Sequence, residues 1–261
     1  MEPIQESKKV KVVLTGFEPF GSHLTNPSWL SIQPLHNTTL ELPPSTTNPK
    51  HGAVGADIFC QELPVEYRKV PDLIHDLHNR HSRNRNLAPK ASGDDAVHEG
   101  EDVIQEGKKA ENYLKTYYIH LGVGRDGYTA IETLANRTGY QHPDNAQWSP
   151  ESLNEPPVKK DAWSTDPDQL FTTVDSAALA KCLGAENNWT CQQSTDAGHY
   201  LCEYTFYLSM AERRRRIAAG EEGEDERTCL FVHLPSVGNP YSLEQLQQFV
   251  KEMVIAVVST Y

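Results

Sequence analysis

Apolar and polar positions along the chain follow two different periods, and together they predict an α/β fold. Short runs rich in β-branched and aromatic residues are typical of buried strands, predicted at residues 9–15, 56–63, 116–122, 128–135, 189–193 and 230–232. Apolar residues that recur every three or four positions predict helices at residues 27–32, 70–81, 174–183, 201–208 and 243–257. This order of elements predicts a mixed, mostly parallel sheet with helices on both faces.

Three stretches between these elements have no such period. Residues 36–53 are rich in Thr, Asn and Pro and are expected to form a surface loop. Residues 82–109 are dense in charge, and residues 213–228 begin with four arginines and continue into an acidic run. We expect both to be mobile insertions. No clean linker divides the chain, so residues 1–261 are predicted to form a single domain.

Charge and cysteine content limit which partners and which cellular compartment are expected for the protein. The chain has 24 basic and 36 acidic residues, a formal net charge of −12, which disfavours nucleic acid and anionic membrane surfaces as partners. No apolar run approaches the length of a membrane span, and the N-terminal residues lack the apolar core of a signal peptide. The five cysteines are odd in number and scattered. Free thiols in a reducing cytoplasm are therefore expected.

One cysteine occupies a position that favours reactivity. Asp196 and Gly198 supply turn and capping chemistry directly before the helix predicted from Leu201, so Cys202 lies in the first turn of that helix. Unpaired backbone N–H groups and the positive end of the helix dipole favour a thiolate there. The simpler interpretation of a single cysteine is a small buried hydrophobe, and Cys202 alone does not exclude it.

A histidine at the end of a strand makes the reactive interpretation stronger. Leu230, Phe231 and Val232 predict a buried strand that Pro235 ends, so His233 falls at its carboxyl end. Side chains at this edge of an α/β sheet reach the active crevice. His233 is therefore a candidate general base for Cys202, although a single histidine at a strand end is more often structural.

Three motifs carry a family resemblance. Residues 14–21 (Leu-Thr-Gly-Phe-Glu-Pro-Phe-Gly), 196–202 (Asp-Ala-Gly-His-Tyr-Leu-Cys) and 231–235 (Phe-Val-His-Leu-Pro) together resemble pyroglutamyl peptidase type I, the cysteine peptidases also called pyrrolidone-carboxyl peptidases. The resemblance implies a cysteine exopeptidase that removes N-terminal pyroglutamyl residues from peptides. It also implies the catalytic residues Cys202, His233 and Glu132, with Glu132 orienting the histidine as the third member of a triad does.

The resemblance implies a substrate pocket near residues 16–21. Phe17 and Phe20 lie on a loop at the end of the first strand, where they are suited to wall a small apolar pocket, although either could pack beneath the loop. Gly122, at the end of the strand 116–122, is a third candidate substrate-binding residue. Gln141 aligns where many bacterial members of the family carry an arginine, so backbone N–H groups near Cys202 are favoured as oxyanion donors.

Two other patterns in the sequence do not predict ligand sites. His75, His78 and His81 recur every third residue of a predicted helix, but no acidic or cysteine ligand completes a metal site, so a solvated helix face is favoured. Gly122 and Gly124 lack the third glycine of a dinucleotide-binding loop. We therefore expect neither a metal nor a cofactor.

The sequence leaves two alternatives to the exopeptidase open. One is a different cysteine amidase or acyl hydrolase that acts on a small lactam or amide with the same three residues. The other is an inactive binding relative, although the presence of Glu132, Cys202 and His233 disfavours a decayed site.

Overall fold

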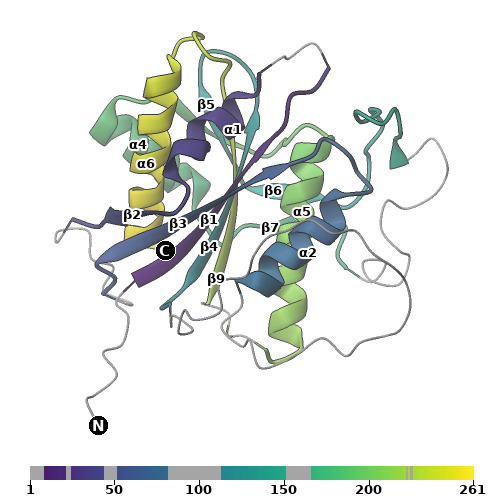
Figure 1. Ribbon diagram of the computed structural model, residues 1–261, viewed down its shortest axis with the longest axis horizontal. Helices are drawn as coiled ribbons and strands as arrows, with labels where there is room; N and C mark the ends of the chain where they lie inside the picture. Colours follow the sequence, from purple (N-terminus) through teal and green to yellow (C-terminus); the bar gives the residue numbers. More distant parts are fainter. Residues whose placement is uncertain are drawn as a thin grey trace.

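The computed structural model describes residues 9–21, 25–43, 52–81, 113–150, 166–221, 223 and 226–261. Within this part of the chain, a seven-stranded sheet of order β2-β3-β1-β4-β9-β5-β8 forms the centre of the molecule (Figure 1). Its strands are β1 (Lys9–Phe17), β2 (Thr38–Glu41), β3 (Gly55–Leu63), β4 (Thr116–Val123), β5 (Thr129–Glu132), β8 (Cys191–Ser194) and β9 (Arg227–Leu234). Strands β3, β1, β4 and β9 are mutually parallel, whereas β2 and β5 run antiparallel to β3 and β9. The predicted mixed, mostly parallel sheet is confirmed.

Helices cover both faces of this sheet, as predicted. One face carries α1 (Pro27–Ile32), α4 (Ser176–Asn187) and α6 (Leu243–Thr260), and the other carries α2 (Val70–Arg80) and α5 (Leu201–Ala218) (Figure 1). Successive side chains of β4 point to opposite faces of the sheet, and this alternation explains why an apolar cluster lies on each face. Tyr117 and Ile119 belong to the apolar cluster under α6, and Tyr118 belongs to the cluster under α2 and α5. Both clusters form one continuous domain around a single sheet.

Helix α5 and strand β9 lie antiparallel and are nearly equal in length. At about 1.5 Å per helical residue and about 3.3 Å per strand residue, each spans roughly 26 Å. The start of α5 therefore lies beside the carboxyl end of β9, and the later turns of α5 lie beside its amino end. At the first of these ends, the cysteine end, Cys202 and His233 line one cavity. At the other, the arginine end, Arg213 Nε donates to the Arg227 carbonyl over 2.9 Å.

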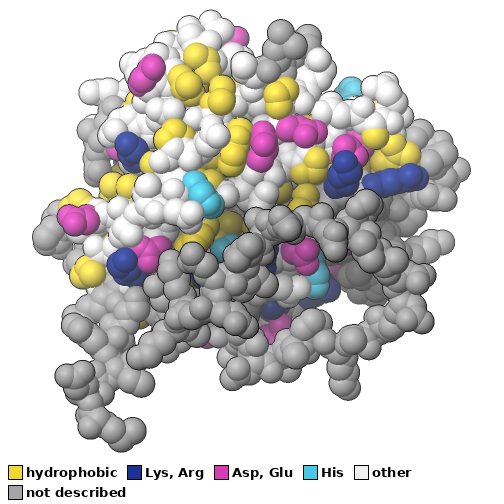
Figure 2. Space-filling view, in the orientation of Figure 1, with side chains coloured by type: hydrophobic (Ala, Val, Ile, Leu, Met, Phe, Trp, Pro, Cys, Tyr) yellow, Lys and Arg dark blue, Asp and Glu magenta, His cyan; other side chains and the backbone are white. Residues whose placement is uncertain are grey.

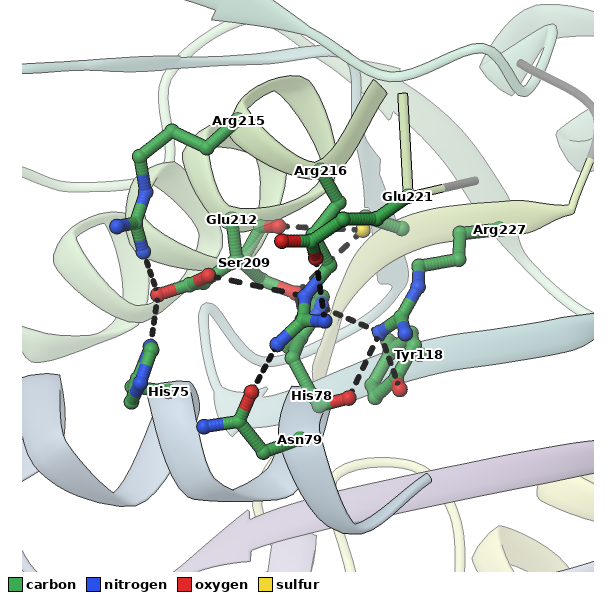
Figure 3. A network of polar contacts seen from close by, with 11 residues as sticks. His75, His78, Asn79, Tyr118, Ser209, Glu212, Arg215, Arg216, Glu221 and Arg227 are labelled. Atoms are coloured by element: carbon green, nitrogen blue, oxygen red, sulfur yellow. Dashed lines mark hydrogen bonds and ion pairs between the residues drawn. The ribbon is translucent and has the colours of Figure 1, made fainter. Parts of the chain in front are cut away.

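The arginine end of this pair is held to α2 by a buried polar network (Figure 3). Arg227 Nη1 donates to His78 Nδ1 at 2.9 Å and to the Tyr118 hydroxyl at 2.7 Å. The His78 ring stacks on Tyr118 with centroids 3.8 Å apart, and its Nε2 lies 3.0 Å from Ser209 Oγ.

A buried carboxylate extends this network along α5. Glu212, only 1% exposed, accepts from Arg215 and contacts His75 Nδ1 at 2.8 Å.

The network corrects the expectation of a solvated histidine face on α2 at His78, whereas His75 is exposed as expected. His78 is fully buried between α2, β4 and α5, because its ring fills the space beside Tyr118 and both of its nitrogens have partners. Three-residue spacing identifies one helix face but does not say which part of that face packs inward. Among the described residues no group of His, Cys, Asp and Glu could hold a metal ion.

Other expectations require correction at element boundaries. Residues 36–53 were expected to be a loop, but Thr38–Glu41 form the edge strand β2, whose polar residues need only one neighbouring strand. The expected strand 128–135 is divided into β5 and β6 (Leu134–Asn136), and β6 leaves the main sheet to pair with β7 (Gln169–Phe171).

The expected insertions have different outcomes. Residues 213–218 continue α5, and residues 227–228 begin β9, so the connection between the two elements is shorter than the predicted 213–228. The last turn of α5 holds Arg215 and Arg216, where the helix dipole favours positive charge. The predicted insertion at 82–109 lies outside the described residues.

The described surface has few large exposed apolar side chains. Only Val54, Phe171 and Val237 are clearly exposed among the large hydrophobic residues described. On the face shown in Figure 2, hydrophobic side chains are dispersed among polar and charged ones. Across the described ranges, the helices are all too short or too polar to span a membrane.

Candidate active site

The structure brings the three predicted catalytic residues together at the carboxyl end of β9. Cys202 is the second residue of α5, His233 is near the end of β9, and Glu132 is the last residue of β5. All three line the same cavity. The antiparallel pairing of β5 with β9, in which Ala130 lies opposite His233, carries Glu132 back alongside the histidine.

His233 contacts an acid on one side and a thiol on the other. Its Nδ1 lies 2.8 Å from Glu132 Oε1, and the imidazole also hydrogen-bonds Cys202. Because Nδ1 is engaged by the carboxylate, Nε2 is the nitrogen that remains for the sulfur. Glu132 is 1% exposed, so its charge is shielded little by solvent. The arrangement orients the imidazole as a triad does.

The surroundings of His233 determine its protonation. Burial alone disfavours the imidazolium, but the charge and hydrogen bond of Cys202, together with the hydrogen bond and charge of Glu132, outweigh burial and raise the pKa of His233 above its usual value. The imidazolium form of His233 is therefore favoured beside the Cys202 sulfur. An imidazolium in this place stabilises a thiolate nucleophile and holds the proton that a leaving group needs.

Two glycines leave the space that these side chains occupy. A Cβ at Gly122 would lie 2.7 Å from Cys202 Sγ, and a Cβ at Gly124 would lie 2.7 Å from His233 Cβ. Real Cβ atoms do not approach other atoms so closely. Gly122, a predicted substrate-binding residue, is therefore placed behind the sulfur, and the Gly-x-Gly pattern has a packing reason unrelated to nucleotides.

A cavity of about 350 Å³ opens beside the sulfur. Phe20 and Tyr200 stand in its wall with ring centroids 6.2 Å apart, and the cavity is within the size range of small-molecule sites. Phe17 is not part of this wall. It is 2% exposed and belongs to the core under α2 and α5, so of the two predicted phenylalanines only Phe20 faces the cavity.

The first turn of α5 is a source of backbone N–H donors next to the cavity. The N-cap residue Tyr200 makes no side-chain cap to this turn, and both Tyr200 and Cys202 line the cavity. A carbonyl oxygen bound there would meet donors and the positive end of the helix dipole. Gln141 is not among the residues that line the cavity.

Sequence reasoning missed several residues of the cavity wall. Arg125, Tyr128, Ala197 and Tyr200 line it together with the predicted residues. Tyr200 could have been found from its position directly before the helix of Cys202. Arg125 and Tyr128 follow β4, and only the fold shows that this connection passes over the site.

The chain is similar to known peptidases along most of its length. No family model matches it. The curated relatives include pyroglutamyl-peptidase 1 of Mus musculus, 27% identical over 253 residues that cover 95% of this chain and 90% of the relative. They also include a pyrrolidone-carboxylate peptidase of Thermococcus onnurineus, 26% identical over 232 residues, 87% of this chain and 84% of the relative.

Solved structures agree on the fold. The crystal structure of pyroglutamyl peptidase I from Bacillus amyloliquefaciens matches with a TM-score of 0.64 at 20% identity and covers 97% of this chain and 95% of that one. The resemblance deduced from the three motifs is confirmed, since curated homologues of the chain carry these names.

Proposed function

We propose that this homologue of the pyroglutamyl peptidases is a cysteine exopeptidase that removes N-terminal pyroglutamyl residues from peptides. The observation that carries the proposal is the contact series from Glu132 through His233 to Cys202, at the edge of a small cavity walled by Phe20. The names of the homologues point to the same reaction.

In the proposed first step the Cys202 thiolate attacks the pyroglutamyl carbonyl carbon. The negative charge that develops on the carbonyl oxygen is stabilised by N–H groups at the start of α5. The tetrahedral intermediate then collapses, the C–N bond breaks, and His233 transfers its proton to the leaving amine. A thioester joins the pyroglutamyl group to Cys202.

In the proposed second step water resolves the thioester. Neutral His233 removes a proton from the water, which attacks the carbonyl, and the C–S bond breaks to release pyroglutamate and the thiolate. Glu132 stabilises the imidazolium in both steps through its 2.8 Å contact. The two steps use these side chains, the backbone N–H groups at the start of α5 and water.

The lining of the cavity suits a ring without a positive charge. A pyroglutamyl terminus is a lactam and carries no ammonium, so it needs apolar walls and few charged partners. Of the two carboxylates in the lining, Glu132 already pairs with His233 at 2.8 Å, which leaves Asp196 as the carboxylate that could face an N-terminal ammonium. The positive charges of His233 and Arg125, both in the lining, oppose such an ammonium and favour an uncharged terminus.

The proposed setting is the cytoplasm, with peptides as the partners. All five cysteines are free thiols, which fits a reducing compartment. The net charge of −12 disfavours nucleic acid and anionic membranes as partners.

Paired fluorogenic amides test the proposal. Release of the fluorophore from a pyroglutamyl amide, but not from the matching alanyl amide, is expected, and a thiol alkylator should abolish it. Cleavage of the alanyl amide alone would indicate another cysteine amidase. Binding of the pyroglutamyl amide without cleavage would indicate an inactive relative.

A further inference from the structure

A second buried carboxylate lies next to the nucleophile but takes no part in the steps above. Glu203 follows Cys202 in the first turn of α5 and is fully buried. Its Oε1 accepts the backbone N–H of Asn136 at 2.9 Å and the Asn136 side-chain Nδ2 at 2.6 Å. Its Oε2 accepts the His199 backbone N–H at 2.9 Å and lies 3.1 Å from His199 Nδ1.

These contacts come from two segments that are far apart in the sequence. Burial of a carboxylate costs several kcal/mol unless hydrogen bonds replace its water, and here both oxygens have partners. The partners are the strand β6 on one side and the turn before α5 on the other. Glu203 therefore fixes the distance between these two segments.

The turn that Glu203 holds is a conformation that the chain does not adopt freely. Gly198 has φ +93° and His199 has φ +49°, two successive residues in the left-handed region. A residue other than glycine costs of the order of 1 kcal/mol there and persists only when its surroundings hold it. Gly198 and Tyr200, on either side of His199, line the cavity. The direction of the peptide groups entering α5 depends on this turn.

The strand that Glu203 holds continues from the acid of the triad. β6 begins two residues after Glu132, and its last residue, Asn136, is itself held by Gln169 Nε2 at 2.9 Å and by the Tyr140 hydroxyl. Asn136 therefore offers Glu203 a fixed anchor. One carboxylate links the turn in front of Cys202 to the segment that carries Glu132.

We propose that Glu203 is a positioning residue for the reaction at Cys202. It holds the turn at residues 198–199 so that the N–H groups at the start of α5 face the developing oxyanion. The inference rests on the proposed function, and it adds a residue that acts through the backbone. Its loss should weaken stabilisation of the transition state and leave the reactivity of the thiolate unchanged.

The test compares two buried carboxylates on the same helix. In Glu203→Gln one accepting oxygen becomes an amide that faces N–H donors, so the turn loses an acceptor. We expect kcat on the pyroglutamyl amide to fall about tenfold to a hundredfold with little change in KM. The rate of alkylation of Cys202 by iodoacetamide, which needs no oxyanion donors, should stay within about twofold.

The matched control is Glu212→Gln, which removes a carboxylate of similar burial about two and a half turns along α5. It should lower thermal stability without changing kcat per folded molecule. Glu203→Asp, which keeps the charge but withdraws it by one methylene, should retain more kcat than Glu203→Gln. It also serves as the test variant if the glutamine protein does not fold, with the same pattern of lower kcat and unchanged alkylation.

The outcomes separate this inference from the proposed function. Wild-type protein that cleaves no pyroglutamyl amide overturns both. Wild-type activity with an unchanged kcat in Glu203→Gln overturns the positioning role alone. An equal fall in kcat for Glu212→Gln, or an alkylation rate that falls as far as kcat, would also overturn it, because the effect would then be general destabilisation or lost thiolate.

Discussion

A buried histidine lies at each end of the contact between helix α5 and strand β9, His233 on β9 itself and His78 on the neighbouring helix α2, and the two histidines have opposite charge preferences. His233 lies between Glu132 and Cys202, which raise its pKa in spite of burial. His78 is buried beside Arg227, and desolvation and that positive charge together hold its pKa well below the usual value. The same residue type is a cation at one end and neutral at the other, according to the sign of its neighbours.

The two ends also differ in whether their polar groups are open to a ligand. At the arginine end Arg227 and His78 donate and accept within the protein, and the His78 ring is covered by Tyr118 (Figure 3). At the cysteine end a cavity of about 350 Å³ adjoins the ion pair, and the first turn of α5 has no side-chain cap. Polar groups paired within the protein support stability at one end, whereas an ion pair and an uncapped helix start beside a cavity permit chemistry at the other.

Removing the cation at the cysteine end should have the largest effect. His233→Ala is expected to lower kcat/KM at least about a thousandfold, because both the thiolate partner and the proton donor are lost. The rate of alkylation of Cys202 near neutral pH should fall as well. Steady-state kinetics and timed alkylation measure the two effects, and a variant that retains most of its activity would contradict the assignment.

Breaking the charge network at the arginine end should affect stability and not activity. Glu212 is buried among His75, Arg215 and Arg216, and Glu212→Gln leaves these positive groups short of a counter-charge. The expected loss in the free energy of unfolding is about 3–5 kcal/mol, measured by urea denaturation. A variant as stable as the wild type would show that the network contributes little.

Glu132→Gln tests whether the negative charge of Glu132 makes His233 a cation, because the variant removes that charge but keeps an oxygen near His233 Nδ1. We expect kcat/KM to fall by about a hundredfold, less than for His233→Ala. Since Glu132 raises the pKa of His233, the alkaline limb of the pH–rate profile, where the imidazolium is lost, should move to lower pH. An alkaline limb that stays in place would argue against Glu132 as the charge partner.

The smallest effect is expected at the neutral histidine. The folded pKa of His78 is depressed, so the unfolded chain binds a proton that the folded chain does not, and stability falls as the pH drops below about 6.5. One such group contributes a slope of about 1.4 kcal/mol per pH unit, which His78→Gln should remove. Urea denaturation at several pH values measures the slope, and an unchanged slope would mean that His78 is protonated in the fold.

Much of the sheet could be predicted because each central strand is a continuous apolar run. Val12, Val13 and Leu14 in β1 are buried on both faces, as a parallel sheet requires. The edge strand β2 could not be predicted in this way, since Thr38 and Thr39 are exposed and carry no apolar signal. Its existence depends on pairing with β3, a contact between distant residues.

The candidate site was predictable where the chemistry lies at the ends of elements. Cys202 begins a helix and His233 ends a strand, and both positions can be identified from local turn and proline signals. The different positions of the two phenylalanines could not be predicted, because Phe17 is the last residue of β1, Phe20 lies in the loop beyond it, and only the path of the chain there decides which ring faces the cavity. Glu203 was missed because nothing local distinguishes it from a charged residue on a helix surface.

The most direct test of the central claim follows the sulfur during turnover. Wild-type protein is mixed with a fluorogenic pyroglutamyl amide, quenched in acid within the first turnovers and digested. The mass of the peptide that contains Cys202 is then measured by mass spectrometry. If Cys202 is the nucleophile, this peptide carries an added pyroglutamyl group, and Cys202→Ala releases no fluorophore. Release of the fluorophore by Cys202→Ala at the wild-type rate would contradict it.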